Sequence, residues 1–269
     1  MKKATPGLAG AVRIDQLKLD DLNRAEKHGK RLDKSSQARS TDANSPPITT
    51  TGLDLRRQYE KHVKGAFIPK AKAKAMHVIV QFPTDLVDPD NPEFMLHHAR
   101  AFVEKVFGTA SIFGDRVDRD EKGQHVVDIF IAPKYTKKTK HTAKTAVSMS
   151  NHLKELAASY GRRTNVHETG RALQDALFDY LREDMGLARA ERGSPKVFPG
   201  DDWKSAEELR ERELSGQEDE VQAELARTRR VREEAEQLKA DAAEKLRLAE
   251  AEKAWHDNTK RDLGFVDKA

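Results

Sequence analysis

The chain has 269 residues, of which 37% are hydrophobic and 35% are charged, and it contains no cysteine. This composition excludes a disulfide framework and a thiolate metal site, and the hydrophobic content is low for a single compact globule. The net charge of +4 is uneven, because residues from Pro199 onward carry 14 basic and 20 acidic side chains, against 35 and 25 before it. We therefore expect a basic body at residues 1–198 and an acidic tail at 199–269, and a basic body is typical of nucleic-acid binding.

The sequence has no apolar run long enough to span a membrane, and residues 1–7 lack the apolar core of a signal peptide. A cytoplasmic protein is the resulting expectation. The basic body also has a simpler explanation, since surface lysines are common on proteins that bind no nucleic acid.

Hydrophobic periodicity predicts an α+β body. Residues 11–18 alternate as a strand with Val12 and Ile14 on one face, and residues 19–34 predict a loop with a helical turn. The later elements follow in chain order: a loop at 35–51, a helix at 53–63, a central strand at 76–82, a helix at 92–107, paired strands at 110–113 and 126–132, a loop at 134–144, and helices at 146–160 and 170–185.

The tail has a different composition. Residues 205–260 contain no proline and a single glycine, Gly216, and are rich in Glu, Arg, Lys, Ala and Leu. Small and apolar residues recur at steps of three and four, at Val231, Ala235, Leu238, Ala242, Leu246 and Ala249. This spacing is close to a heptad seam and predicts a coiled coil. Because alanine is frequent in the seam, a weak or partner-dependent coil and a single exposed helix both fit it.

The segment Val117–Pro133, which connects the paired strands and includes the second, concentrates side chains that bind divalent metals. Asp118, His125 and Asp128 lie within eleven residues, and carboxylates and neutral imidazole are common ligands of such ions. We predict that these three residues hold a metal. A regular strand would place His125 and Asp128 on opposite faces, so the prediction requires a β-bulge. A solvated turn is the alternative interpretation.

A second candidate site is the H-x-x-R spacing of His28 and Arg31. A neutral histidine can act as a nucleophile, and a neighbouring arginine can hold the phosphate under attack. An exposed histidine among charged residues is the alternative interpretation.

Two basic segments, residues 64–74 and 134–144, adjoin strands of the predicted sheet. Their lysines can pair with the phosphates of a single DNA strand, while bases stack on nearby rings such as Phe67, Tyr135 and His141. Solvated loops are the alternative. The DNA-binding residues that we predict are Arg13, Lys70, Lys72, Lys74, Lys137, Lys138 and Lys140.

These motifs occur in an order that resembles the plasmid mobilisation and recombination relaxases, the Mob/Pre family of MobV type. The chain begins with V-R-I-D-Q-L-K at 12–18 and K-H-G-K-R at 27–31, and Q-Y-E-K at 58–61 stands before a basic segment and an apolar strand. Then follow V-D-R-D-E-K-G-Q-H-V-V-D-I-F-I-A-P and L-F-D-Y-L-R-E-D-M-G-L-A-R-A-E-R-G-S-P-K. The resemblance covers residues 10–198, and the charged tail matches by type.

The resemblance implies an antiparallel sheet flanked by helices, an HUH-like relaxase fold. Such enzymes nick one strand at a plasmid transfer origin, stay covalently attached to the 5′ phosphate and use a divalent metal. The family's H-x-x-R motif assigns the nucleophile to His28 and its partner to Arg31. The family's metal motif, H-x-D-E-x-x-P-H-x-H, aligns its acidic pair with Asp120 and Glu121, and Glu121 is the expected base.

The metal motif departs from the family pattern at two of its three histidines. Asp118 and Val127 stand at the first and third positions, and only His125 is kept. We expect Asp118 and Asp128 to replace the missing ligands. The ion is then expected to be Mg²⁺ or Mn²⁺, because carboxylates favour hard metals.

Two other functions fit the same residues. With an inactive metal motif the chain would be a non-catalytic DNA-binding protein, and a rolling-circle replication initiator would share the chemistry. Tyr59 is an alternative nucleophile, although its spacing from Leu55 and Val63 also suits packing. The expected partners are single-stranded and supercoiled plasmid DNA at a transfer origin. For the tail they are a second copy of the chain or the conjugation machinery.

Overall fold

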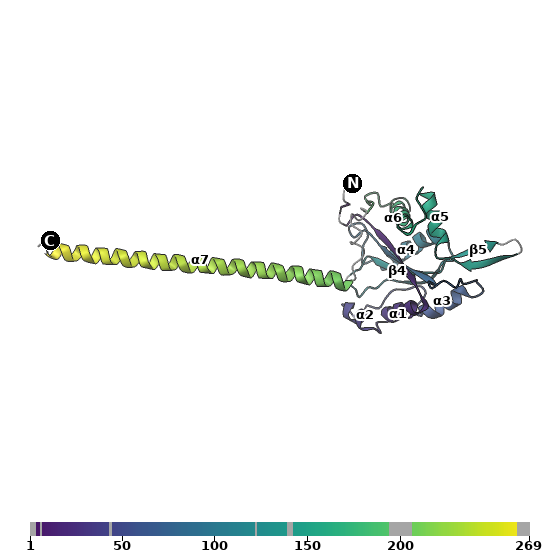
Figure 1. Cartoon of the computed structure of the whole chain (residues 1–269), viewed down its shortest axis with the longest axis horizontal. Helices are drawn as coiled ribbons and strands as arrows, with labels where there is room; N and C mark the ends of the chain where they lie inside the picture. Colours follow the sequence, from purple (N-terminus) through teal and green to yellow (C-terminus); the bar gives the residue numbers. More distant parts are fainter. Residues whose placement is uncertain are drawn as a thin grey trace. The chain divides into compact units, whose positions relative to one another are not determined.

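The structure is a computed structural model that describes residues 4–5, 7–42, 45–121, 123–138, 142–193 and 206–262. The chain divides into two compact units, Met1–Pro195 and Lys196–Ala269 (Figure 1). The described elements of the first unit are β1 (Ala11–Leu17), α1 (Leu19–Gly29), α2 (Lys34–Arg39), α3 (Leu55–Val63), β2 (Ala75–Gln81), α4 (Pro92–Phe107), β3 (Ile112–Arg116), β4 (Val126–Ile131), β5 (Lys134–Lys138), β6 (Ala143–Val147), α5 (Asn151–Ser159) and α6 (Val166–Glu183).

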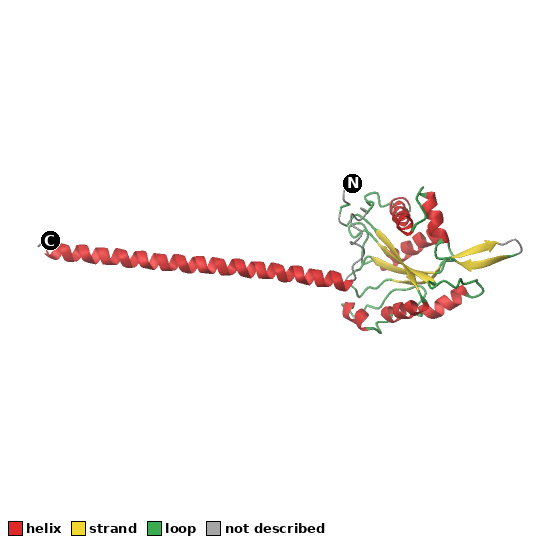
Figure 2. Ribbon diagram, in the orientation of Figure 1, coloured by secondary structure: helices red, strands yellow, loops and turns green. Residues whose placement is uncertain are grey.

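Four strands form an antiparallel sheet in the order β1-β2-β4-β3, which confirms the α+β architecture and the central place of β2 (Figure 2). β4 pairs with β2 without interruption from Val126 to Ile131. A register shift lies instead in β3, between Ile112 and Gly114. The strand that carries Asp128 is therefore regular over its whole described length, and the β-bulge that we expected there is not present.

The two faces of the sheet bury separate apolar clusters, because side chains alternate along each strand. Val78, Val127 and Ile129 belong to the cluster that packs against α4 and α6. Leu17 and Phe130 belong to the cluster that packs against α1 and α3. Figure 1 shows α4, α5 and α6 on one side of the sheet and α1, α2 and α3 on the other. A side chain's position in a strand therefore decides which helices it meets.

The segment from 19 to 39 is more helical than expected. Residues 19–29 form a complete helix, α1, whose first turn contains Asp20 and Asp21, and acidic side chains stabilise a helix N-terminus. The carboxylate of Asp21 also accepts a hydrogen bond from the backbone N–H of Lys18 at 2.7 Å. The expected loop at 35–51 begins with α2, which Asp33 caps by accepting a bond from the N–H of Ser36. Side-chain caps thus make two short helices from a polar segment.

The segment 134–147 was predicted as a loop followed by the start of a helix, and that prediction is wrong. Residues 134–138 and 143–147 pair as the antiparallel strands β5 and β6. Ala146 and Val147, expected at the beginning of a helix, are buried strand residues, and α5 begins only at Asn151. The hairpin extends beyond the four-stranded sheet (Figure 1).

In the second unit, α7 runs from Ala206 to Asp262. Its large apolar side chains are exposed, including Val231, Leu238 and Leu246, with 64%, 69% and 63% of their surface accessible. The long helix that we predicted is confirmed, while its pairing as a coiled coil stays a prediction. Among the described residues, no helix has the length and apolar character needed to cross a membrane.

Candidate active site

The candidate site lies where the end of α1 meets the loop between β3 and β4. His28, in the last turn of α1, is half-buried, and its Nε2 lies 3.2 Å from Oε1 of Glu121. Its Nδ1 lies 3.6 Å from Oδ2 of Asp33. The imidazole is thus held between two carboxylates, one near each ring nitrogen. A histidine placed in this way can pass a proton to one carboxylate while the other orients the ring.

Arg31 follows α1 in a left-handed backbone conformation, with φ of 56°, which is uncommon for a residue with a side chain. This turn returns its guanidinium to the helix end, where Nη1 donates to the carbonyl oxygen of His28 at 2.9 Å. Nε donates to Oδ2 of Asp120 at 2.8 Å, and Nη2 bonds to the other carboxylate oxygen. Asp118 and Glu121 lie 3.2 and 3.4 Å away. The bonded Asp120 and the other two acids raise the pKa of Arg31, so it is a permanent cation.

A second guanidinium, that of Arg116 in β3, is almost completely buried, with 4% of its side chain exposed. Its Nε lies 3.0 Å from Oδ2 of Asp118, and its Nη2 donates to Oδ2 of Asp128 at 2.8 Å. Its Nη1 donates to the carbonyl oxygen of Ala25 at 3.1 Å. Burial alone would lower the pKa of Arg116, but the charges of Asp128 and Asp118 raise it above its ordinary value. Arg116 therefore ties the sheet to α1 and adds a fixed positive charge to the site.

Asp118 lies between the two guanidinium groups. Its Oδ1 is buried and accepts no hydrogen bond from the described residues, although Nη2 of Arg31 is 3.2 Å away. The pKa of Asp118 is raised to about 6, chiefly by burial, which outweighs the lowering effect of Arg116 and acts together with the charge of Asp128. A buried carboxylate oxygen without a hydrogen bond favours an additional cation.

Asp128, by contrast, is fully engaged. Nε2 of His77 lies 2.9 Å from its Oδ1, and Arg116 bonds to its Oδ2. Burial alone would raise the pKa of Asp128, but the charges of His77 and Arg116 hold it well below its ordinary range. The ring of His77 in turn stacks on Phe130, with centroids 4.6 Å apart and an interplanar angle of 9°. Asp128 is thus an ion-pair partner built into the sheet.

The structure does not bring the three predicted metal ligands together. His125 lies on the sheet face opposite Asp128, and its Nε2 is 3.1 Å from the carbonyl oxygen of Val87. His125 stands one residue before β4, and its partner Val87 belongs to the same apolar cluster as Val127, a fully buried core residue. The predicted group of Asp118, His125 and Asp128 is therefore not the arrangement observed.

A different group could hold a metal. Among the described residues it consists of His28, Asp118 and Glu121, whose ligand atoms lie within 4.8 Å of one another. One nitrogen and two carboxylate oxygens suit hard ions such as Mg²⁺ and Mn²⁺. The charge also fits, because carboxylates outnumber guanidinium groups there, the groups being Asp118, Asp120, Glu121 and Asp128 against Arg31 and Arg116.

Gly29, the last residue of α1, leaves room for Arg116. A Cβ at Gly29 would lie 2.4 Å from Nη1 of Arg116, which cannot move aside without losing Ala25. We expect Gly29→Ala to lower the free energy of unfolding by about 1–3 kcal/mol, measured by chemical denaturation. Gly170→Ala in α6 is the matched control, because a Cβ there meets nothing within 4 Å. We expect that variant to keep or gain about 0.5–1 kcal/mol. Equal stability of the two variants would contradict the packing of Arg116.

The alternative nucleophile, Tyr59, lies in the core. It is 4% exposed, and its ring meets Phe113 edge to face with centroids 5.5 Å apart. Burial raises the pKa of its hydroxyl, which makes the nucleophilic phenolate harder to form. These observations favour the packing interpretation of its spacing.

The predicted DNA-binding residues lie in three places. Arg13 is in β1, where its Nε is 3.4 Å from Oδ2 of Asp15. Lys74 donates from Nζ to the carbonyl oxygen of Pro69 at 2.8 Å, at the end of the basic segment that precedes β2. Lys140 lies outside the described residues. The others are exposed or half-buried in the segment before β2 and in β5, and are Lys70, Lys72, Lys137 and Lys138.

Three residues of the site were not among the predicted ones. Arg116 had a usable signal, because it precedes Asp118 by two residues and so shares its face in an extended chain. Asp33 had only the signal of a helix cap, which says nothing about a neighbouring histidine. His77 reaches the site only through the register of β2 and β4, which the sequence does not reveal.

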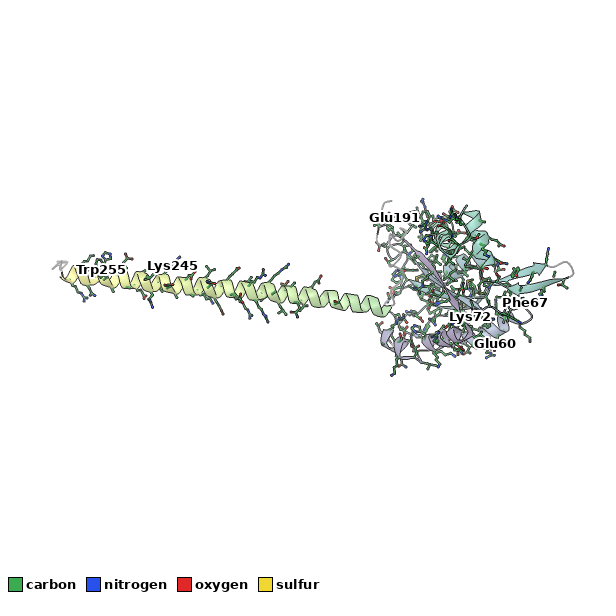
Figure 3. The ribbon with its side chains drawn as sticks, in the orientation of Figure 1. Glu60, Phe67, Lys72, Glu191, Lys245 and Trp255 are labelled. Carbon is green, nitrogen blue, oxygen red and sulfur yellow. The ribbon has the colours of Figure 1, made fainter. Side chains whose placement is uncertain are left out.

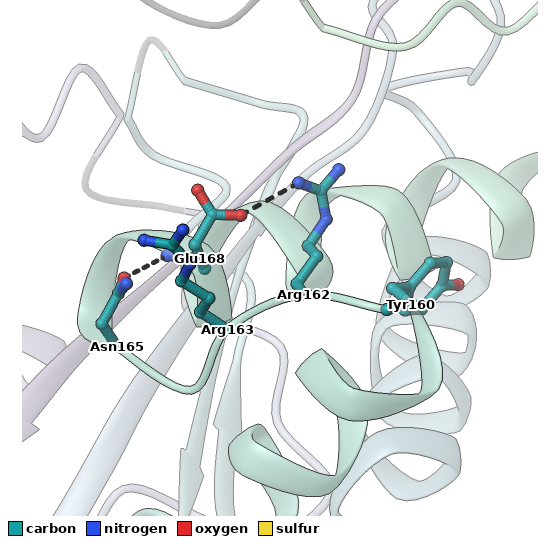
Figure 4. Close-up of a pocket in the computed structure, with 6 residues that line it drawn as sticks. Tyr160, Arg162, Arg163, Asn165 and Glu168 are labelled. Carbon is teal, nitrogen blue, oxygen red and sulfur yellow. Dashed lines mark hydrogen bonds and ion pairs between the residues drawn. The ribbon is translucent and has the colours of Figure 1, made fainter.

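A hollow of about 540 Å³ lies at the turn between α5 and α6, apart from this site, and Figure 4 shows the side chains around it. Arg162 pairs there with Glu168 at 3.2 Å and with Asp175 at 2.6 Å. The positive charge of Arg162 is therefore balanced by two carboxylates of α6. The hollow is lined by Tyr160, Gly161, Arg162, Arg163, Asn165 and Glu168.

Comparison with known proteins supports the fold. The sequence has no significant match to a protein-family model or to a curated protein. Among solved structures, it is similar to the MobM relaxase domain (MOBV; Mob_Pre) bound to oriT DNA of plasmid pMV158. In an Mn-bound crystal structure at pH 6.8 the identity is 16% and the TM-score 0.54, over 76% of this chain and 98% of that chain. In a second, at pH 4.6, the values are 16% and 0.52, over 76% and 99%. The first unit therefore has the fold of a MobM-type relaxase domain, which confirms the predicted resemblance at the level of fold.

Proposed function

We propose that this chain is a relaxase, an enzyme that nicks one DNA strand at a plasmid transfer origin and stays attached to the 5′ phosphate. The observation that carries the proposal is the contact of 3.2 Å between Nε2 of His28 and Glu121, with Arg31 beside both. The fold supports it, because the similar MobM domains are described as relaxases bound to oriT DNA. His28 is the proposed nucleophile, Glu121 the base and Arg31 the clamp on the phosphate.

The proposed chemical step exchanges a bond from phosphorus to oxygen for a bond from phosphorus to nitrogen. Nδ1 of His28 keeps its proton throughout, while Glu121 accepts the second ring proton, from Nε2, and the lone pair freed on Nε2 attacks phosphorus. The bond from phosphorus to the 3′ oxygen breaks, and that oxygen takes the proton from Glu121. The carboxylate of Asp33, 3.6 Å from Nδ1, stabilises the positive charge that the ring carries once Nε2 is bonded to phosphorus. The products are a free 3′ hydroxyl and a nitrogen–phosphorus bond, which can be reversed to reseal the strand.

A divalent metal, Mg²⁺ or Mn²⁺, is the proposed cofactor. The similar MobM structures are Mn-bound, and the unsatisfied oxygen of Asp118 and the excess of carboxylates over guanidinium groups support the same class of ion here. Asp118 would hold it, with Glu121 adjacent and with phosphate oxygens and water completing the coordination, as is usual for Mg²⁺. The ion would neutralise charge on a non-bridging phosphate oxygen. His125 and Asp128 have no part in this proposal.

The proposed partners follow from the same function. They are single-stranded DNA and supercoiled plasmid DNA at a transfer origin, in the cytoplasm. For α7, the exposed apolar seam that includes Leu238 supports self-association or contact with the conjugation machinery.

Formation of a covalent protein–DNA adduct tests the proposed function. The purified full chain is incubated with a labelled pool of single-stranded DNA that contains a random segment, with Mn²⁺, with Mg²⁺ or with EDTA. We expect an adduct that survives denaturing electrophoresis with either metal, and a loss of at least about 100-fold in EDTA, since the metal stabilises several kcal/mol of transition-state charge. Sequencing the captured strands then identifies the origin for nicking assays on supercoiled plasmid. Tight binding without an adduct in any metal would favour the non-catalytic alternative.

A further inference from the structure

Phe67 occupies an unusual place beside the β5–β6 hairpin. It lies in the basic segment between α3 and β2, yet its backbone pairs with β6 as a short parallel extension. Its N–H donates to the carbonyl oxygen of Thr145 at 2.9 Å, and its carbonyl accepts from the N–H of Val147 at 3.0 Å. These two bonds fix the backbone of Phe67, but the residue stays 42% exposed. A large apolar ring is thus presented to solvent from a fixed position.

Two lysines lie over this ring. Nζ of Lys144 is 4.1 Å from the ring centroid, and Nζ of Lys137 is 5.3 Å from it. The same two lysines face each other directly across the β5–β6 pair, an arrangement of like charges that costs stability in a hairpin. The negative π face of the ring offsets part of that repulsion. We call Phe67, Lys137 and Lys144 the ring platform.

The two chain segments that supply the ring platform carry only positive charge. Residues 64–74 contain four lysines and residues 134–144 contain five, and neither segment contains an acidic residue. Figure 3 labels Phe67 and Lys72 at the end of the unit where the hairpin lies. An exposed ring with surplus positive charge around it suits a ligand that combines negative charge with flat π surfaces.

We propose that the ring platform binds unpaired nucleotides of single-stranded DNA, with a base stacked against Phe67 and phosphates paired with Lys137 and Lys144. The choice of DNA rests on the proposed function. A duplex would leave the ring unused, because its bases are already stacked inside the helix. An acidic membrane suits the surface less well, since inserting Phe67 would carry the ammonium groups over its ring toward the apolar layer.

The platform is separate from the nicking site. The loop that carries Asp118 and Glu121 comes before β4, and β5 follows the other end of that strand. Six residues of β4 span roughly 20 Å. The platform therefore holds the strand several nucleotides away from the phosphate that is cut, so it sets the path of the DNA and takes no part in the chemistry.

The test measures binding of the full chain to uncut oligothymidylate of about 20 nucleotides, in EDTA, by fluorescence anisotropy. We expect Phe67→Leu to weaken binding by about 5- to 150-fold, the effect of losing one or more stacked bases. Phe67→Tyr should keep wild-type affinity, because it keeps the π face. Phe94→Leu on α4 is the matched control: it is 38% exposed, so it makes the same substitution at a similar surface position, and it should bind as the wild type does.

Two further probes identify the ligand class. A duplex of the same length should bind Phe67→Leu within about twofold of the wild type, because its contacts are electrostatic. The wild type and Phe67→Leu should bind vesicles with acidic headgroups equally well. Equal oligothymidylate binding by Phe67→Leu and the wild type would overturn the proposal, and so would a selective loss of vesicle binding. The binding assay needs no nick. If the chain binds oligothymidylate in this way but forms no adduct, the ring platform is supported and the proposed relaxase function is contradicted.

Discussion

Arg116→Met is expected to lower the free energy of unfolding by about 3–5 kcal/mol, the cost of removing one partner from a buried ion pair. Asp118 and Asp128 would lose the cation that contacts both, at 3.0 and 2.8 Å, and the pKa of each carboxyl would rise. Methionine fills a similar volume, so the loss reports charge more than a cavity. Chemical denaturation measures the free energy of unfolding, and differential scanning calorimetry of separate samples checks it.

Arg56→Met is the matched control, because it makes the same substitution at an exposed pair. Arg56 contacts Glu60 at 2.7 Å, with 37% and 60% of the two side chains exposed. Such pairs contribute about 0–1 kcal/mol, so we expect a small change. Adding Asp118→Asn and Asp128→Asn to Arg116→Met should restore much of the lost stability, since both buried carboxylate charges are removed. A triple variant less stable than Arg116→Met would contradict this account of the site.

The predicted strands and helices succeeded where burial is strong and regular. β2 could be predicted because M-H-V-I-V-Q-F carries apolar residues on both faces, as a central strand does. β5 and β6 could not, because lysines and threonines leave no apolar period, and β6 also bonds to the backbone of Phe67, which is far away in the sequence. α1 was underestimated because it buries few residues, Leu22 among them, and relies on acidic side chains in its first turn. Tertiary contacts, more than periodicity, decide such segments.

The same contrast explains the site. His28 and Glu121 are 93 residues apart, and only the order of motifs suggested that they meet. The three predicted metal ligands do not converge, for a reason already present in the sequence: a spacing of three between His125 and Asp128 divides them between the faces of a regular strand. A bulge was the assumed exception, and β4 has none over its described length. Of the predicted ligands, Asp118 lies beside His28 and Glu121. It precedes β4, so the alternation of side chains in that strand does not decide its direction.

His28→Ala is expected to lower the rate of adduct formation by at least about 1,000-fold, the scale of losing a nucleophile, and to leave DNA binding nearly unchanged. The reason is that Nε2 would form the bond to phosphorus, while the lysines proposed to bind DNA lie elsewhere. Denaturing electrophoresis measures the adduct, and anisotropy in EDTA measures binding. His167→Ala on α6 is the matched control, because that side chain is 71% exposed and lies outside the site.

Tyr59→Phe separates the two candidate nucleophiles. Its hydroxyl belongs to a side chain buried against Phe113, so we expect the variant to form the adduct at the wild-type rate. The chemistry of the adduct gives an independent result, because a bond from nitrogen to phosphorus is cleaved by mild acid, whereas an ester of tyrosine survives it. An acid-stable adduct that disappears in Tyr59→Phe and persists in His28→Ala would move the nucleophile to Tyr59. It would also require the core around Phe113 to open before DNA could reach the hydroxyl.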